Sequence, residues 1–202
     1  MIYAVDVSVH PAAAAAARDD DDFVSTARQI IKHPRGWESL GYTFVFHGSP
    51  DAALPRIRMT LTPQSVLDAR FPDFRHQRLS LCNMTTREIF INEGRWHRWY
   101  DDDKSTMTLR DYRFYVINHE LGHALGFGHA RCPRAGMPAP IMLQQTLGLG
   151  GCTPTRFPVA AALPPPHRPR QLSAGGRRRR QRLSVSRRRR RPRRSKVFSA
   201  RK

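Results

Sequence analysis

Several absences narrow the range of functions before any motif is considered. The 202-residue chain has only three cysteines, and no two of them form a C-x-x-C pair, so the sequence gives little support for a zinc site built from cysteines. No run of about 20 apolar residues occurs, and no transmembrane helix is therefore predicted. No charged leader with an apolar stretch and a cleavage site precedes the first predicted strand, so no signal peptide is visible. Taken literally, these absences predict a soluble, cytoplasmic chain.

Acidic residues are missing from the C-terminal part of the chain. Residues 157–202 carry 17 Lys and Arg and no Asp or Glu, whereas residues 1–156 carry 18 basic and 16 acidic residues. A segment of this composition cannot bury a core. We therefore expect one domain over residues 1–156 and a disordered Arg/Pro-rich tail over 157–202. The tail's charge favours a polyanion as partner, whether nucleic acid, anionic lipid or a cell-wall polymer, although GC-rich coding DNA read out of frame would give the same composition.

The chain does contain one dense motif, H-E-x-x-H-x-x-G-x-x-H, which runs from His119 to His129. Because residues four apart share a helix face, His119 and His123 can bind one zinc ion. Glu120 is one step round the helix, where a general base for zinc-bound water is needed. Gly126 permits the positive φ that ends the helix, and the turn returns His129 as a third ligand with the fourth position open. The ordinary alternative is a solvated polar helix face, but the full pattern arises by chance on the order of once in ten million start positions.

The residues before the motif predict the helix that the motif needs. Thr108 can cap it, and Asp111 three residues later suits both a capping box and the helix dipole. Gly122 weakens a helix, and close packing near the metal is its best explanation. The apolar positions recur at near-helical spacing and are expected in the core rather than in a substrate pocket; they are Tyr112, Tyr115, Val116, Ile117, Leu121 and Leu125.

Met142 follows the third histidine by thirteen residues, in the segment Ala139–Leu143. In the metzincin class of zinc peptidases a methionine in a tight turn lies beneath the metal, after the third histidine. An isolated methionine after a proline-rich turn is ordinarily a core residue. Because Met142 follows a complete zinc motif, we favour its assignment to a Met-turn.

The sequence around these residues resembles a bacterial zincin-like family of otherwise unknown function, which is common in actinobacteria and has secreted or membrane-anchored members. The matching segments are 116–133, 138–146 and 150–152, with looser matches at 33–37 and 89–96. The resemblance extends over residues 1–158. It implies a metzincin-type metallopeptidase domain in which His119, His123 and His129 bind zinc and Glu120 is the base. It implies no substrate.

Cys132 and Cys152 flank the segment that holds Met142 and can be bridged. A loop of about twenty residues closed in this way is stabilised by roughly 3 kcal/mol, and the bridge would imply an oxidising compartment. Cys82 is left over, as a buried apolar residue or as a free thiol; members of the resembling family often have an upstream partner cysteine that this chain lacks. The resemblance and the cysteine pair together favour an extracytoplasmic protein, against the missing signal peptide.

The pattern of apolar residues predicts an α+β fold with a mixed sheet, an active-site helix and a Met-turn. Strands are expected at 2–9, 42–46, 56–61 and 87–92, with helices at 23–32 after a loop and from Thr62-Pro63 onward. Residues 95–104 are expected to be a connection in which Trp96 and Trp99 are either buried anchors or cleft residues. An edge strand above the cleft can pair with an extended peptide, but the sequence does not say which strand it is. The remaining histidines lack ligand spacing and are expected at the surface or in packing; they are His10, His33, His47, His76, His97 and His167.

Taken together, these features predict a zinc-dependent peptidase in which Glu120 activates a zinc-bound water. One alternative is an inactive zinc-binding domain that serves in adhesion or in the cell wall. Another is unspecific binding of nucleic acid or other polyanions through the basic tail.

Overall fold

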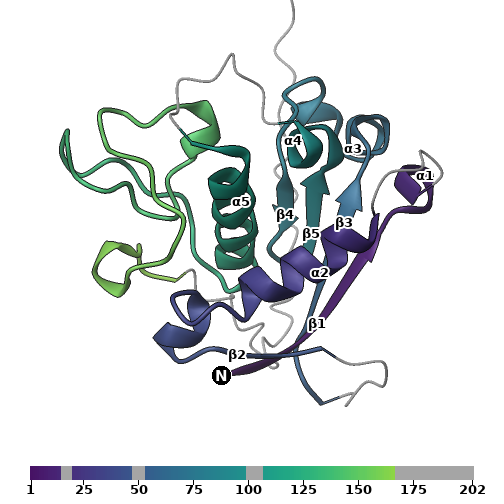
Figure 1. The fold of residues 1–202 in the computed structure, drawn as a ribbon, viewed down its shortest axis with the longest axis horizontal. Helices are drawn as coiled ribbons and strands as arrows, with labels where there is room; N and C mark the ends of the chain where they lie inside the picture. Colours follow the sequence, from purple (N-terminus) through teal and green to yellow (C-terminus); the bar gives the residue numbers. More distant parts are fainter. Residues whose placement is uncertain (15–19, 47–52, 99–106, 167–202) are drawn as a thin grey trace, which may run out of the picture. The chain divides into compact units, whose positions relative to one another are not determined.

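Five strands form one mixed sheet in the computed structural model, which describes residues 1–14, 20–46, 53–98 and 107–166 (Figure 1). The strands are β1 (Ile2–Val9), β2 (Thr43–Val45), β3 (Arg56–Thr62), β4 (Leu81–Asn83) and β5 (Glu88–Asn92). Their order is β2-β1-β3-β5-β4. Strands β2, β1, β3 and β5 run parallel, whereas β4 pairs antiparallel with β5 at one edge. This arrangement confirms the α+β class with a mixed sheet.

Two long helices pack against the sheet (Figure 1). Helix α2 (Asp20–Ile31) contacts β1, helix α5 (Leu109–Ala124) contacts β4 and β5, and the two helices contact each other. The shorter α-helices are α1 (Pro11–Ala14), α3 (Gln64–Arg70) and α4 (Glu93–His97). Short 3₁₀ helices occur at η1 (Trp37–Leu40), η2 (Pro72–Phe74), η3 (Gln145–Leu147) and η4 (Ala160–Ala162). No helix in the described ranges is long and apolar enough to cross a membrane.

The core lies between the sheet and these two helices. Alternate residues of β1, β3 and β5 are buried in one apolar cluster, as expected for strands with one face covered by helices. The strand residues of this cluster are Tyr3, Val5, Val7, Ile57, Met59, Leu61, Ile89 and Ile91. Because α5 adds residues to the same cluster, the motif helix is held directly on the sheet.

The predicted strands agree closely with the structure, but the first long helix does not. The strand over residues 2–9 is confirmed, and those at 42–46, 56–61 and 87–92 differ from β2, β3 and β5 by one residue at one or both ends. Helix α2 begins at Asp20 rather than at residue 23. Residues 12–14, expected to belong to the loop before the first long helix, lie in α1.

Two predictions about the short helices α3 and α4 are wrong. Thr62 does not cap α3, because it is the last residue of β3 and its hydroxyl donates to the carbonyl of Thr60; Pro63 occupies the cap position. Helix α4 overlaps the start of the connection expected at residues 95–104, and its cap is the side chain of Asn92, which accepts from the Arg95 N–H. Trp96 is a buried anchor against Phe23, and Trp99 lies outside the described residues.

The folded part of the chain continues beyond the predicted boundary at residue 156. Phe157 is buried and stacks on His33, with ring centroids 4.7 Å apart. Leu163 packs against the core, and Pro166 forms an isolated bridge with Phe127. Residues 157–166 therefore belong to the domain, and the rest of the predicted tail lies outside the described residues.

Candidate metal centre

Helix α5 presents the first part of the motif. Its first turn is capped as predicted, because the Thr108 hydroxyl oxygen accepts from the Asp111 N–H at 3.1 Å. The helix then runs without a break to Ala124, and His119, Glu120 and His123 are all buried on it. Continuous helical geometry places the two histidines one turn apart on the same face.

The end of α5 turns the third histidine back towards the other two. The N–H of Phe127 bonds to the carbonyl of Gly122, and the N–H of Gly126 bonds to the carbonyl of His123, both at 2.9 Å. This pair of bonds is a Schellman motif, which needs a left-handed residue after the cap. Gly126 supplies it with φ of 101°, as the sequence predicts. The chain that leaves this turn carries His129.

The three imidazoles of the motif each place one ring nitrogen close to the other two. Nε2 of His123 lies 3.1 Å from Nε2 of His129, and one ligand nitrogen from each of His119, His123 and His129 lies within 4.8 Å of the others. Such a group of nitrogens can hold one metal ion. The remaining described histidines, at positions 10, 33, 76 and 97, join no comparable group, whereas His47 and His167 lie outside the described residues.

Backbone carbonyls fix the orientation of the two helical imidazoles. Nδ1 of His119 lies 2.8 Å from the carbonyl oxygen of Ile141, and Nδ1 of His123 lies 2.8 Å from that of Phe127. An Nδ1–H donated to a carbonyl leaves the lone pair on Nε2, which is the arrangement of a metal-binding histidine. Burial, with a smaller effect of His123, lowers the pKa of His119 to about 3, and burial also lowers the pKa of His129. Both shifts favour the neutral imidazole that binds metal.

Glu120 is a buried acid with an unused oxygen. Its side chain is 5% exposed, and within the described part of the chain its Oε2 has no hydrogen-bond partner. Burial raises the pKa of Glu120 to about 8. An unpaired buried carboxyl oxygen is costly, and a metal-bound water beside it would supply the missing partner. The residues present therefore fit a metal with a bound water.

Met142 lies beneath the helix that carries the histidines. It is fully buried, and a Cβ added at Gly122 would lie 2.4 Å from its Sδ and 2.8 Å from Cζ2 of Trp37. Gly122 is therefore required by close packing, as the sequence suggests. Trp37 also donates from Nε1 to the carbonyl of Asn118 at 3.0 Å, so the segment around residue 37 is bonded directly to α5.

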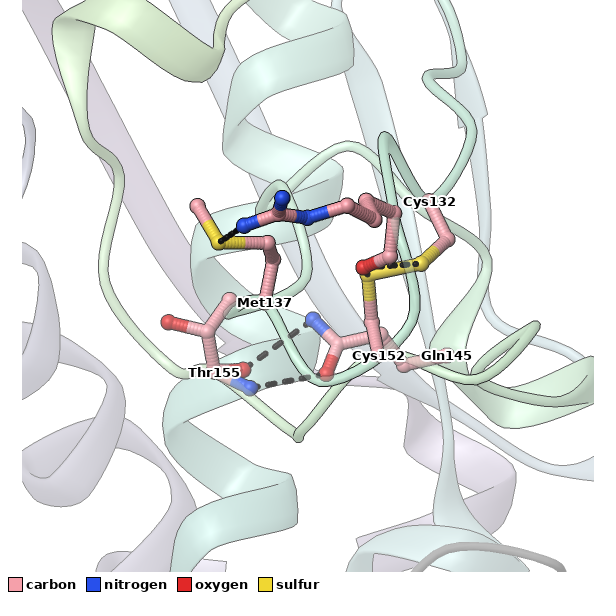
Figure 2. The surroundings of a disulfide bond; sticks show 6 residues. Cys132, Met137, Gln145, Cys152 and Thr155 are labelled. Atoms are coloured by element: carbon pink, nitrogen blue, oxygen red, sulfur yellow. Dashed lines mark hydrogen bonds between the residues drawn. A yellow bond between two sulfur atoms is a disulfide. The ribbon is translucent and has the colours of Figure 1, made fainter.

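Hydrogen bonds connect α5 to the chain that follows Met142. The Tyr115 hydroxyl donates to the carbonyl of Leu143 at 3.0 Å and accepts the N–H of Gln145 at 2.9 Å. The amide of Gln145 in turn bonds both the N–H and the carbonyl of Thr155 (Figure 2). Ala130 donates its N–H to the carbonyl of Met142. These bonds hold the third histidine and the Met142 segment in a fixed relation to α5.

A disulfide joins Cys132 and Cys152, as the sequence allows, with Cα atoms 5.7 Å apart (Figure 2). It closes the segment that contains Met142. Cys82 is free and half-buried on β4. Burial, and secondarily the nearby Glu120, raises the pKa of its thiol, so Cys82 is an uncharged, weakly reactive group.

A cavity of about 370 Å³ opens beside the histidines. Its walls are α5, the edge strand β4, the end of η2 and the segment around η3. The sequence gives no sign of β4, because three residues are too few to show an alternating pattern. It also gives no sign of three wall residues, Phe74, Met84 and Leu147, since each belongs to a short irregular segment.

A comparison with protein families gives a match. No curated protein and no solved structure matches the chain. Over residues 1–159, however, the chain matches a family of proteins whose function has not been established. By this match the chain belongs to the family described as "Protein of unknown function (DUF3152)".

Proposed function

We propose that this protein is a zinc-dependent peptidase. The observation that carries the proposal is the unpaired, buried carboxyl oxygen of Glu120 beside three histidine nitrogens that can share one metal ion. A purely structural role would leave the cost of this buried oxygen uncompensated. A metal-bound water would compensate it, and that water is the nucleophile of zinc peptidases.

Three imidazoles with a fourth position open are the ligand set of catalytic zinc. Two of the three are oriented through Nδ1 by backbone carbonyls, which is how ligating histidines are generally held. When bound, zinc would lower the pKa of its water and polarise the scissile carbonyl. Among common divalent metals, softer nitrogen ligands without carboxylates favour zinc over magnesium or calcium.

The chain's own groups would then perform the proton transfers. Glu120 would accept the proton of the attacking water and pass it to the leaving amine. In the described sheet, β4 is an edge strand that borders the same cavity, and an edge strand can pair with an extended peptide. Such pairing would hold the scissile bond in front of the histidines, because β4 packs directly against α5.

A metzincin-type relationship is part of the proposal. Its support is the order of the elements, with the sheet first and the motif helix after it, and the buried Met142 beneath the helix. The Schellman turn at Gly126 and the third histidine after it have the spacing that this class requires.

The first test is metal content by elemental analysis of the full-length protein after zinc is supplied. We expect about one zinc per chain, which His123→Ala should lose. Two variants should retain it: Glu120→Gln, which keeps the three histidines, and His76→Ala, the matched control at an exposed histidine of the loop before β4. Well-folded protein without bound metal would refute the proposal.

The second test is hydrolysis of a peptide library by the zinc-loaded protein. Wild-type protein and His76→Ala should cleave, whereas Glu120→Gln should lose at least about a hundredfold in rate, as expected for removal of a general base. If the protein binds zinc but neither the wild type nor Glu120→Gln cleaves any peptide, the site is that of an inactive zinc-binding module.

A further inference from the structure

The third histidine of the motif is held less firmly than the other two. His119 and His123 are buried on α5, and a backbone carbonyl orients each ring through Nδ1. His129 lies beyond the helix and is exposed, and within the described part of the chain no hydrogen bond is made by its Nδ1. Because such bonds generally fix a metal-binding imidazole, the position of His129 depends on the backbone that carries it.

Two connections near His129 hold the chain that follows it. The N–H of Ala130 donates to the carbonyl of Met142 at 2.9 Å. Two residues further on, Cys132 is bonded covalently to Cys152 (Figure 2). One backbone hydrogen bond contributes little net stability in water, whereas a disulfide removes many conformations of the open chain. The disulfide is therefore the stronger of the two connections.

Packing does little to replace the disulfide in this part of the fold. A hollow of about 590 Å³ is lined by residues 129–131 and also by residues from 147–150. The chain before Cys132 and the chain before Cys152 thus have open space beside them instead of close contacts. If the disulfide were opened, the segment 129–132, here called the His129 segment, would gain freedom to move.

The disulfide can be reached by a reductant. Cys132 is half-buried, and residues 133–138 after it are exposed, although Cys152 is buried. A dithiol can attack the sulfur of Cys132 by thiol–disulfide exchange. Two electrons and two protons then pass to the protein: its S–S bond breaks, two S–H groups form, and the dithiol closes its own disulfide.

We infer that the Cys132–Cys152 disulfide is a redox switch for the metal centre. The oxidised chain binds zinc, and reduction by a dithiol frees the His129 segment and lowers the affinity. The inference rests on the proposed function, since it concerns the metal centre of the same site. Disulfides persist in oxidising compartments and are reduced in the cytosol, so the switch would restrict metal loading to an oxidising compartment.

The first measurement is the zinc affinity of the full-length protein in its two redox states, by competition with a chromogenic chelator. Reduced protein is prepared with dithiothreitol, which is removed without air before the titration. The Kd for zinc should rise about tenfold to a hundredfold on reduction, as is typical when the support of a metal ligand is lost. An unchanged Kd, or a lower one because the new thiolates bind zinc, would refute the switch.

Two variants assign the response to this disulfide. Cys132→Ser with Cys152→Ser lacks the bond and its thiols, so it should bind zinc as weakly as the reduced wild type and not respond to the reductant. Cys82→Ser keeps the disulfide and should respond like the wild type. A response in the double serine variant, or none in Cys82→Ser, would contradict the assignment.

Near-ultraviolet circular dichroism separates a local release from unfolding. The buried Trp37 and Trp96 report on the packing of the core. Their signal should be the same in the oxidised and reduced proteins without metal. Its loss on reduction would show that zinc is released by global unfolding, and the switch would be refuted.

Thermodynamic linkage supplies an independent measurement. If reduction weakens zinc binding tenfold, bound zinc must make the disulfide tenfold harder to reduce, a shift of about 30 mV in its two-electron reduction potential. The potential is measured in glutathione buffers with and without a fixed concentration of free zinc, and alkylation with mass spectrometry counts the thiols. Equal potentials in the two series would refute the inference.

The outcomes for the switch and for the peptidase can be told apart. A zinc affinity that does not depend on redox state, together with peptide cleavage, refutes the switch and leaves the peptidase proposal intact. Redox-dependent zinc binding without cleavage of any peptide supports the switch and refutes the peptidase. Oxidised protein that binds no zinc refutes both.

Discussion

Gly122 leaves room on α5 for the side chains of Met142 and Trp37. A methyl group at this position would fall 2.4 Å from the Met142 Sδ, so Gly122→Ala must displace the Met142 segment or the helix. We expect a loss of about 1–3 kcal/mol in the free energy of unfolding, as for other overpacked cores. Urea denaturation checks this value.

A double-mutant cycle supplies the control for Gly122. Because Met142→Ala removes the sulfur that the new methyl group would meet, Gly122→Ala and Met142→Ala together should cost less than the sum of their separate effects. Strict additivity would show that the loss in Gly122→Ala does not come from this contact.

Glu88 on β5 makes the stability of the sheet depend on pH. A hydrogen bond from the Thr86 hydroxyl, with added effects of Arg58 and Arg70, lowers the pKa of Glu88. A lowered pKa in the folded state stabilises the fold above the unfolded value of about 4.3, and this contribution is lost as the pH falls through the folded value. Glu88→Gln should therefore cost up to about 1 kcal/mol at pH 7, because both arginines are largely exposed.

The measurement for Glu88 is a series of urea denaturation curves between pH 7 and pH 3. The difference between wild type and Glu88→Gln should shrink below about pH 4, where the carboxyl group is protonated. Asp73→Asn, at an exposed acid in η2, is the control for a general loss of negative charge. A difference that stays constant with pH would contradict this account of Glu88.

At the scale of elements, the irregular chain after α5 depends on crosslinks for its position. Residues 125–166, all of which the structure describes, contain no β-strand or α-helix of the sheet and helices given above. Their position in the fold therefore depends on isolated bridges, hydrogen bonds and the disulfide. The disulfide spans a sequence separation of 20, for which the chain-entropy model gives about 3 kcal/mol. Cys132→Ser with Cys152→Ser should lower the free energy of unfolding by about that amount.

Thermal and urea unfolding of the double serine variant check this prediction. Cys82→Ser is the control, because it removes a half-buried thiol but no crosslink. Equal losses in the two proteins would show that the disulfide contributes nothing beyond the packing of its sulfur atoms.

At the scale of the whole molecule, charge is divided between the domain and the C-terminal residues. The structure describes the chain up to residue 166, and all 17 basic residues of the last segment lie beyond that point. Truncation after Pro166 should abolish binding to heparin or DNA and leave the free energy of unfolding unchanged. The affinity of the full chain should fall steeply with salt, since counterion release drives such binding.

Fluorescence anisotropy with labelled DNA at several salt concentrations measures this effect. A truncated protein that still binds DNA with the same salt dependence would place the binding surface on the domain instead. Zinc content and peptide hydrolysis of the truncated protein should equal those of the full chain, because the histidines, Glu120 and β4 all precede residue 166.

The sequence by itself determined the parts of this protein that depend on neighbours along the chain. Helical spacing puts His119 and His123 on one face, and the Thr108 cap and the Gly126 exit follow from residue types with strong local preferences. The strands β1, β3 and β5 are long enough for their alternation to be visible. The α+β class follows from these same local signals.

Only the tertiary structure decided which distant segments meet at the site. Strand β4 is defined by its pairing with β5 and its contact with α5, which no pattern within three residues can reveal. The carbonyl that orients His119 comes from Ile141, and the cavity rim comes from residues 74, 84 and 147. These relations depend on packing between elements, because side-chain contacts across tens of residues are set by how helices, sheet and loops fit together and not by local backbone preference.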